Sequence, residues 1–417
     1  MRNCFAVEIR GNVGVLSAVG FMMFCAALYA CLLAAPPTYA ADVAPIVSRA
    51  CCECHRDGGV APFALASPQD LIKRARTIAR AVRDDSMPPW FAVVAEGSAH
   101  RFKNDASLSA ADKATLLAWL DSDERALGDL SKAPPPRPVA PAWRISTPDV
   151  VFEIPAPVEI KAKGTMNYVN VRVPTNFTED VWVREWEVVP SAREAVHHVL
   201  VFARPPEAKG RGAGEDEGRG FFAAFVPGGG MRSYDSTRAK KLPKGSTLIF
   251  QLHYTPNGQA TQDRTKIGLV LAKTAPEHEV RTVGIFDSAL DIPPHTATHR
   301  EMSSLTAPAD IRILSWMPHM HTRGKSFVAY RKGDGAREVL IDVPRYDFNW
   351  QLSYDYATPL EVTKGTLIHI EGVFDNSAEN SANPDPSKRV RWGQQTTDEM
   401  LIGYIDYELA HEIALEK

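Results

Sequence analysis

Hydrophobic and polar residues follow two different periods along the chain, and the period changes near Pro148. In residues 41–130 the apolar positions recur with helical spacing. Ser67, followed by a proline and then an acidic residue at the third position, is typical of a helix start. That helix is expected to run to about Asp84, and Ser109 predicts the start of the next one. This first part is therefore predicted to be a small all-α domain.

From Pro148 onwards the pattern becomes one of short alternating runs separated by Pro, Gly and Asn turns. Such runs predict antiparallel β-sandwiches. About 270 residues of this texture are too many for one sandwich by ordinary domain sizes, so we expect two, at residues 145–275 and 276–417. Five prolines within residues 131–142 predict a semi-rigid linker, residues 131–144, between the helical and β parts.

The amino terminus, residues 1–40, is predicted to be a signal peptide. Arg2 and Arg10 precede a nearly continuous apolar run, and Thr38-Tyr39-Ala40 resembles a cleavage site before Ala41. The protein is then expected to be periplasmic or secreted. Because the apolar run is long for a signal peptide, an uncleaved membrane anchor is the alternative.

Charge and cysteine content restrict which partners the protein can have and what can stabilise its β part. The chain has 47 basic and 50 acidic side chains and no basic block, which argues against nucleic acid as a partner. After cleavage only Cys51, Cys52 and Cys54 would remain, all in one cluster. Disulfides therefore cannot stabilise the β part, although an exported protein meets an oxidising compartment.

Cys51, Cys54 and His55 form a C-x-x-C-H motif, which is the spacing for covalent attachment of a c-type haem with His55 as the proximal iron ligand. A zinc or redox cysteine pair is the alternative, but zinc needs two more ligands nearby and a redox pair does not need His55. Met87, on a proline-rich turn, is either the distal ligand or a packing residue. This part of the chain resembles a small class I-like cytochrome c domain, and that resemblance makes Met87 the axial choice.

Histidines in the β part provide candidate metal ligands. His319 and His321 are alternate residues of a predicted strand end, so both side chains can face one point. His197 and His198 are neighbours, and both can bind one metal only at a strand end or a bulge. His253 lies on the polar face of another predicted strand. Taken singly, each of these could be an ordinary surface or core histidine.

Five short stretches, in this order along the chain, together resemble the copper type II, ascorbate-dependent monooxygenases. They contain His197-His198, Leu242-Pro243-Lys244-Gly245, Gln251-Leu252-His253-Tyr254, His319-Met320-His321 and Thr397-Asp398-Glu399-Met400. That group includes peptidylglycine α-hydroxylating monooxygenase and dopamine β-monooxygenase. The resemblance covers about residues 145–417. It implies two jelly-roll-like sandwiches, each carrying one copper ion, on opposite sides of a solvent-filled cleft.

The resemblance also assigns residues to the two copper ions. It implies that His197, His198 and His253 bind the electron-donating copper. It implies that His319, His321 and Met400 bind the copper at which dioxygen reacts, although Met400 by composition alone would be a core methionine. A thioether beside two imidazoles favours Cu(I) over zinc.

Two further positions concern the substrate. Tyr404 matches a substrate-contacting tyrosine of the peptide-hydroxylating members, and an ordinary strand tyrosine is the alternative. Met317 stands where those members place an arginine for the peptide carboxylate, which argues against a glycine-extended peptide as substrate.

The function implied is hydroxylation of a substrate C–H bond with dioxygen. Its partners would be dioxygen, a small-molecule substrate and an electron donor, either ascorbate or a redox protein. The fused haem is expected to pass electrons to the copper at His197, His198 and His253. The alternatives are a non-enzymatic periplasmic protein that transfers electrons or handles copper, and a zinc-dependent hydrolase. Met400 argues against the hydrolase, because a thioether ligand favours Cu(I) over zinc.

Overall fold

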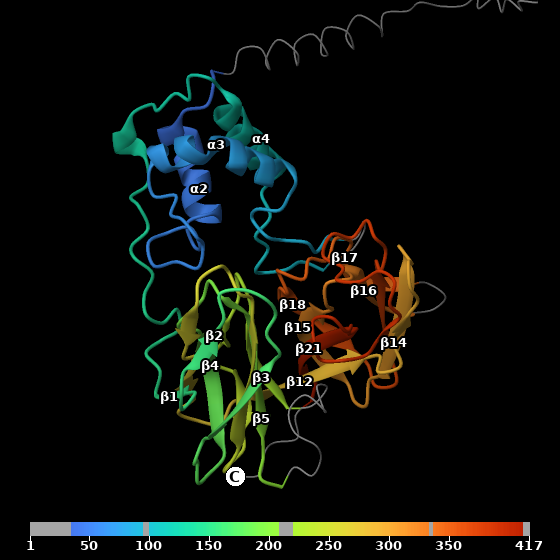
Figure 1. The fold of residues 1–417 in the computed structure, drawn as a ribbon. Helices are drawn as coiled ribbons and strands as arrows, with labels where there is room; N and C mark the ends of the chain where they lie inside the picture. Colours follow the sequence, from blue (N-terminus) through green and yellow to red (C-terminus); the bar gives the residue numbers. More distant parts are fainter. Residues whose placement is uncertain (1–34, 95–99, 208–219, 333–336, 412–417) are drawn as a thin grey trace, which may run out of the picture.

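The computed structural model describes residues 35–94, 100–207, 220–332 and 337–411. A helical part lies against two β-sandwiches that stand side by side (Figure 1). Most of the predicted signal peptide, residues 1–34, lies outside the described residues. Within the described ranges, no helix has the length and apolar character needed to span a membrane. The coarse prediction of a mainly β protein is confirmed, whereas the cytochrome c-like fold of the helical part stays a prediction.

The helical part begins where the sequence places its capping residues. The Ser67 hydroxyl accepts the Asp70 N–H while the Asp70 carboxylate accepts the Ser67 N–H, so the predicted helix start is confirmed with a full capping box. Ser109 caps the next helix in the same way, through the Asp112 N–H. A core around Trp119 joins these helices. The elements are η1 (Tyr39–Val43), α2 (Ala44–Ala50), α3 (Pro68–Arg83), α4 (Ala110–Asp121) and η2 (Leu130–Lys132).

The position of the predicted signal cleavage is packed inside this helical part. The Tyr39 ring lies 5.8 Å from the Trp119 ring, centroid to centroid, and its backbone N–H donates to the Ala126 carbonyl at 2.8 Å. Ala40 is only 1% exposed. A cut before Ala41 would therefore remove two packed residues from the helical core.

The first sandwich packs the sheet β3-β9-β5-β6 against the neighbouring strands β1, β11, β4 and β8. Its strands are β1 (Val150–Glu153), β2 (Val158–Ile160), β3 (Val169–Pro174), β4 (Val181–Val189), β5 (Val196–Arg204), β6 (Phe221–Phe225), β7 (Met231–Ser233), β8 (Arg238–Leu242), β9 (Thr247–Tyr254), β10 (Thr261–Asp263) and β11 (Lys266–Leu271).

The second sandwich packs the sheet β14-β19-β16-β17 against β12, β21, β15 and β18. Its strands are β12 (His278–Phe286), β13 (Asp291–Ile292), β14 (His299–Thr306), β15 (Ile311–His319), β16 (Gly324–Lys332), β17 (Arg337–Val343), β18 (Tyr354–Val362), β19 (Leu367–Phe374), β20 (Val390–Arg391) and β21 (Ile402–Leu409).

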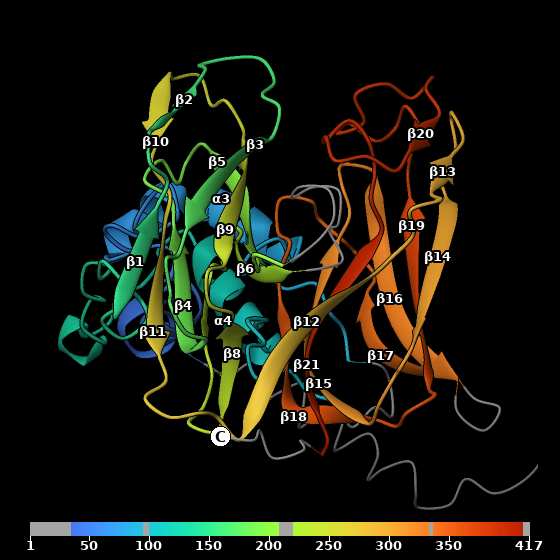
Figure 2. The same ribbon diagram turned by 90° about the horizontal axis from the view of Figure 1, so that it is seen from below.

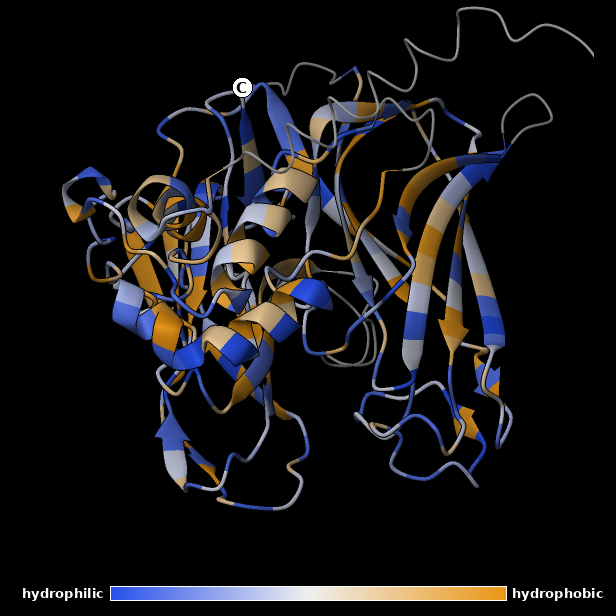
Figure 3. Cartoon of the chain, turned by 90° about the horizontal axis from the view of Figure 1, so that it is seen from above, coloured by the Kyte–Doolittle hydropathy of each residue, from blue (hydrophilic) through white to orange (hydrophobic). Residues whose placement is uncertain are grey.

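The inner sheets of the two sandwiches are one continuous sheet, because β12 pairs in parallel with β8 (Figure 2). The predicted boundary between residues 275 and 276 falls in the connection from β11 to β12. Hydrophobic and hydrophilic positions alternate along the strands of the second sandwich (Figure 3), and every second residue of β19 is buried. Cys51, Cys52 and Cys54 are free thiols and lie before the first strand, so no disulfide joins the described β strands.

A segment between α3 and α4, residues 88–104, leaves the helical part and packs against the second sandwich; we call it the arm, of which residues 95–99 are not described. The Val93 N–H donates to the Asp342 carbonyl at 2.8 Å. The Phe102 ring stacks on Tyr356 at 5.5 Å, and the Trp90 ring lies 4.9 Å from Tyr354. The arm thus attaches the helical part to the second sandwich by ring packing and a backbone hydrogen bond.

Replacing both Trp90 and Phe102 by alanine is therefore expected to release the helical part from the second sandwich. The two rings lose contacts that, for buried aromatic residues, stabilise by about 3 kcal/mol each. Small-angle scattering should record a larger radius of gyration. As the matched control, six Gly/Ser residues inserted after Pro138 should leave the radius unchanged. Separation caused by the insertion alone would show that the linker, and not the arm, fixes the domains.

Candidate metal centre

His197 and His198 point to one place because the strand that carries them is irregular. The pairing of β5 with β9 shifts register between Val196 and His198, which is the bulge that two neighbouring ligands require. His253 on β9 is the pairing partner of His198 across the ladder. The sequence-based condition for these two neighbours is thus met, and the third histidine stands opposite them.

The three imidazoles form a compact donor set. One ring nitrogen from each of His197, His198 and His253 lies within 4.8 Å of the other two. The Nδ1 atoms of His197 and His198 are 3.1 Å apart. Two nitrogens bound tetrahedrally to one metal at about 2.0–2.1 Å would be about 3.3 Å apart. His253 points its Nε2 at the Thr396 hydroxyl, 3.0 Å away, and its buried Nδ1 has no protein partner. This set can hold a metal through its Nδ1 atoms.

His319 and His321 form a second set at the end of β15, with ring centroids 5.3 Å apart. The Nδ1–H of His319 donates to the side-chain oxygen of Gln351 at 2.6 Å. The Nδ1–H of His321 donates to the Asp398 carbonyl at 3.2 Å. Because a carbonyl oxygen only accepts, each Nε2 is left unprotonated and available to a metal. The buried His321 Nε2 has no protein partner.

Met400 lies 1% exposed on the segment that leads into β21. It belongs to an apolar cluster that joins Leu200 and Phe202 of the first sandwich to Met317 and Tyr404 of the second. Its segment lies beside His321, whose Nδ1–H donates to the carbonyl of Asp398, two residues before Met400. That the Met400 sulfur joins His319 and His321 as a metal ligand stays a prediction.

Glu399, which sequence reasoning overlooked, holds this second set in place. Its buried carboxylate accepts the backbone N–H groups of His321 at 2.8 Å, Arg323 at 2.7 Å and Met400 at 3.1 Å. One carboxylate thereby ties the His-x-His turn to the methionine. Burial raises the pKa of Glu399 to about 7. An acidic residue directly before the methionine was the only sequence signal for this role.

The two sets adjoin each other. The ring centroids of His198 and His319 are 6.1 Å apart, and Phe348 stacks on His197 at 4.3 Å while lying 6.0 Å from His321. A cavity of about 760 Å³ reaches His197, His253 and Phe348 from outside. The two sets lie closer together than expected for two sites across a solvent-filled cleft, because the His198 and His319 ring centroids are 6.1 Å apart.

Tyr404 and Met317, the predicted substrate positions, are cross-strand partners on β21 and β15. The Tyr404 ring stacks on Phe221 of the first sandwich at 4.6 Å and lies 6.5 Å from His319. Both residues border a cavity of about 560 Å³ that also reaches Cys54 of the helical part. Met317 and Tyr404 thus border this cavity, whereas His319, His321 and Met400 do not.

The predicted haem residues lie in the turn after α2. The His55 Nδ1–H donates to the Phe63 carbonyl at 2.9 Å, which leaves Nε2 for an iron. The Cys52 thiol is buried and donates to the Leu65 carbonyl at 3.4 Å, so this third cysteine packs in the helical core. Cys51 and Cys54 remain as the residues to which a haem could be attached. These residues fit a covalent haem. Met87 is half-buried after α3, with its backbone N–H bonded to Ala81.

Burial keeps the ligand histidines neutral. It lowers the pKa of His197 and His319 to about 4 and that of His253 to about 3. His198 and His321 are fully buried, and their pKa values lie well below the usual range. Neutral imidazoles are the form that binds a metal, so the set is ready for one at neutral pH.

The metal-free protein should consequently lose stability as the pH falls from 6.5 towards 4. In that range the histidines bind protons in the unfolded chain but stay neutral in the folded protein. This lowers the free energy of unfolding by about 1–2 kcal/mol per buried imidazole at pH 5. Glu399 acts in the opposite direction, but one carboxyl cannot offset five imidazoles. Urea unfolding at pH 7.5 and at pH 5 measures the free energy of unfolding at each pH. His198→Asn should make the difference between the two values smaller. A free energy of unfolding that is the same at both pH values would contradict it.

Two groups of buried histidines lie close together where the two β-sandwiches meet: His197, His198 and His253, whose ring nitrogens are near enough to hold one metal ion, and His319 with His321. Residues 283–416 match the model of the family described as copper type II ascorbate-dependent monooxygenase, C-terminal domain. This match confirms the family prediction for the second sandwich, and with it copper as the metal of that family. No curated protein matches the chain significantly.

Solved structures show only distant likeness. One is PNGF-II, at 9% identity, a TM-score of 0.29, and coverage of 63% of this chain and 66% of that one. Another is the major capsid protein P2 of bacteriophage PM2, at 10% identity, a TM-score of 0.26, and coverage of 64% and 99%. A third is PBCV-1 VP54 fitted into a reconstruction of the virophage Sputnik, at 9% identity, a TM-score of 0.23, and coverage of 67% and 99%. Similarity this low bears neither on fold nor on function.

Proposed function

We propose that the protein is an exported copper-dependent monooxygenase that hydroxylates a substrate C–H bond with dioxygen and receives electrons through a c-type haem in its helical part. The observation that carries the proposal is the pair of adjoining imidazole sets, 6.1 Å apart between the His198 and His319 rings. The match of residues 283–416 to the copper monooxygenase family supports it. The amino-terminal segment 1–40 would direct export.

In this proposal the first copper is held by the Nδ1 atoms of His197, His198 and His253. The second is held by the Nε2 atoms of His319 and His321 and by Met400. Copper supplies one-electron chemistry and the reaction with dioxygen.

The chain's own groups prepare these ligands. Gln351 and the Asp398 carbonyl fix the tautomers of His319 and His321, so each ring offers Nε2 without a change of protonation. Thr396, from the second sandwich, hydrogen-bonds His253 of the first and so orients the third ligand of the other set. Burial excludes water from His198 and His321, both 0% exposed, which protects a reactive site from competing reactions.

Two contacts of the helical part support the proposed delivery of electrons from it. Ser86, the neighbour of Met87, lines the same cavity as His197 and His253. Arg345 of the second sandwich donates to the backbone carbonyls of Asp84 and Asp85 in the same turn. This arrangement supports the route from haem to the His197, His198 and His253 set.

Metal analysis together with the visible spectrum tests the proposal. We expect two copper ions and one haem per chain, a haem that stays attached after acid–acetone extraction, and oxygen consumption by the reduced protein. Haem that extracts freely would refute covalent attachment. A protein that binds copper and haem but consumes no oxygen would be an electron-transfer or copper-handling protein, a reading that the short distance between the two sets also suits.

A further inference from the structure

Backbone pairing between the two sandwiches is short among the described strands, and it ends at Lys240. Strands β8 and β12 pair in parallel, and the last pair of this ladder joins Val280 to Lys240. From there β8 continues beside β4 and β12 continues beside β21, each within its own sandwich. Past this point, side chains hold the two sandwiches together.

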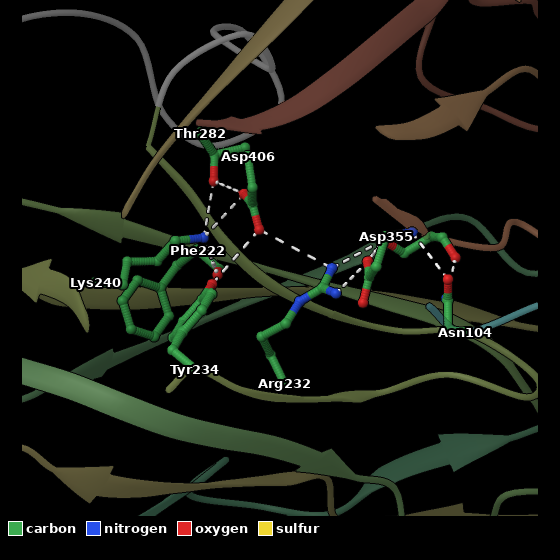
Figure 4. Close-up of polar contacts among 9 residues, drawn as sticks. Asn104, Phe222, Arg232, Tyr234, Lys240, Thr282, Asp355 and Asp406 are labelled. Atoms are coloured by element: carbon green, nitrogen blue, oxygen red, sulfur yellow. Dashed lines mark hydrogen bonds and ion pairs between the residues drawn. The ribbon is translucent and has the colours of Figure 1, made fainter. Parts of the chain in front are cut away.

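Lys240 bridges the sandwiches at the end of this ladder (Figure 4). Its side chain is buried, at 4% exposure. The ammonium donates to the Phe222 carbonyl of the first sandwich at 3.0 Å. It also donates to the Thr282 hydroxyl at 2.8 Å and the Asp406 carboxylate at 3.4 Å, both in the second sandwich. Burial lowers the pKa of Lys240, but three acceptors require all three ammonium protons, so the side chain is charged.

Asp406 is held from both sandwiches in return. Besides the ammonium, it accepts the hydroxyl proton of Thr282 and lies 4.0 Å from the guanidinium of Arg232. Arg232 also forms an ion pair with Asp355 on β18. Two cations of the first sandwich thus face two carboxylates of the second, and their charges sum to zero. Removal of one member of such a buried cluster is strongly destabilising, because it leaves an uncompensated charge.

The arm joins this group of side chains as well. The Asn104 side-chain oxygen accepts the Asp355 N–H at 2.9 Å, and its amide donates to the Ser353 carbonyl at 2.8 Å. The Ser353 hydroxyl accepts from Arg232 at 2.8 Å. One continuous set of polar contacts therefore connects the two sandwiches and the arm. We call it the interface cluster: Asn104, Arg232, Lys240, Thr282, Ser353, Asp355 and Asp406.

The interface cluster contacts the strands next to those that carry the histidine sets. Phe222 lies on β6, which pairs with β5, the strand of His198. Asp406 lies on β21, which pairs with β15, the strand that ends at His319. The position on β15 that pairs with Asp406 is four residues, or about 13 Å, from His319. Lys240 thus connects the neighbour of one histidine strand to the neighbour of the other.

We propose that Lys240 is a positioning residue of the metal centre, which holds the two sandwiches at the spacing at which the two histidine sets adjoin. That spacing places the His198 and His319 ring centroids 6.1 Å apart. The role of the two sets as copper sites rests on the proposed function, whereas the spacing is a property of the protein itself. Without the ammonium, Asp406 keeps a buried charge, and separation of the sandwiches lets water reach it.

Pulsed electron paramagnetic resonance between two nitroxide labels tests this in the haem- and copper-loaded protein. The labels are attached through Val151→Cys on β1 and Met302→Cys on β14, which are exposed positions on different sandwiches. We expect Lys240→Met to make the distribution of label distances at least twice as wide. Lys241→Met is the matched control, because the neighbouring Lys241 is half-exposed and pairs with Asp180 of its own sandwich. It should leave the distribution unchanged.

Asp406→Asn is the second variant, since it keeps the shape of the side chain and removes its charge. It should widen the distribution in the same way, and the magnetic coupling between the two oxidised copper ions should weaken with it. The thermal midpoint and the haem spectrum report folding. Lower thermal midpoints with unchanged label distances in both variants would show that Lys240 only stabilises the protein, and would overturn the proposal. Oxygen consumption of the parent protein is measured separately. If it is absent, the proposed function fails, while the label distances still decide the role of Lys240.

Discussion

Met400→Ala is expected to reduce hydroxylation by roughly 100-fold or more, because removal of groups that merely orient a ligand already costs 10–100-fold. In the proposed function the Met400 thioether is the soft donor of the second set, and it is the donor that a zinc site would not need. Its loss should leave His197, His198 and His253 with their copper, since Met400 belongs to neither β5 nor β9. The haem should still pass electrons to that first copper.

The measurement combines copper content, the haem spectrum and hydroxylation coupled to oxygen consumption. Met302→Ala is the matched control, because Met302 lies 49% exposed on β14 and should leave all three unchanged. If Met400→Ala retains both copper ions and full oxygen consumption, the monooxygenase proposal fails and electron transfer becomes the function.

His253→Ala is expected to stop electron passage from haem to copper while the His319, His321 and Met400 set still loads. The change removes one of three Nδ1 donors, and it also breaks the 3.0 Å contact to Thr396 that joins the two sandwiches. Rapid mixing of reduced protein with oxygen should show haem reoxidation slowed by roughly 100-fold. Copper content should fall from two ions to one.

Thr396→Val separates the loss of the His253 imidazole from the loss of its hydrogen bond to Thr396. It removes the hydroxyl that orients His253 but keeps the imidazole, so copper should stay at two ions and haem reoxidation should slow by less than in His253→Ala. Haem reoxidation at the normal rate in His253→Ala would mean that electrons reach the second set directly, as the 6.1 Å separation of His198 and His319 would permit.

Local patterns in the sequence were sufficient to predict several structural features of this protein. Ser67 and Ser109 cap the helices they were expected to cap, because a cap is formed by residues three positions apart. The His197-His198 pair required a bulge, and β5 has one, because neighbouring side chains on a regular strand cannot face one point. His319 and His321 also lie close together, although β15 ends at His319 and His321 follows it in the turn.

Other parts depended on residues far apart in the chain. Gln351, which fixes His319, is 32 residues away from it; Glu399 is 78 residues from His321; and Thr396 is 143 residues from His253. No spacing rule connects such residues, since only the paired sheets bring them into contact. The position of the Phe348 ring near His197 and His321, and the attachment of the helical part through the arm, also depend on residues far apart in the chain.

By itself the sequence determined the donor types, the helix starts, the β texture and the family resemblance, because each is written in residue identity or in short-range periodicity. Only the tertiary structure decided how near the two histidine sets lie, which nitrogens stay free, and that the charges of Arg232, Lys240, Asp355 and Asp406 cancel in one buried cluster. Those properties arise where strands of different sandwiches meet, and burial there gives each hydrogen bond and charge its energetic weight.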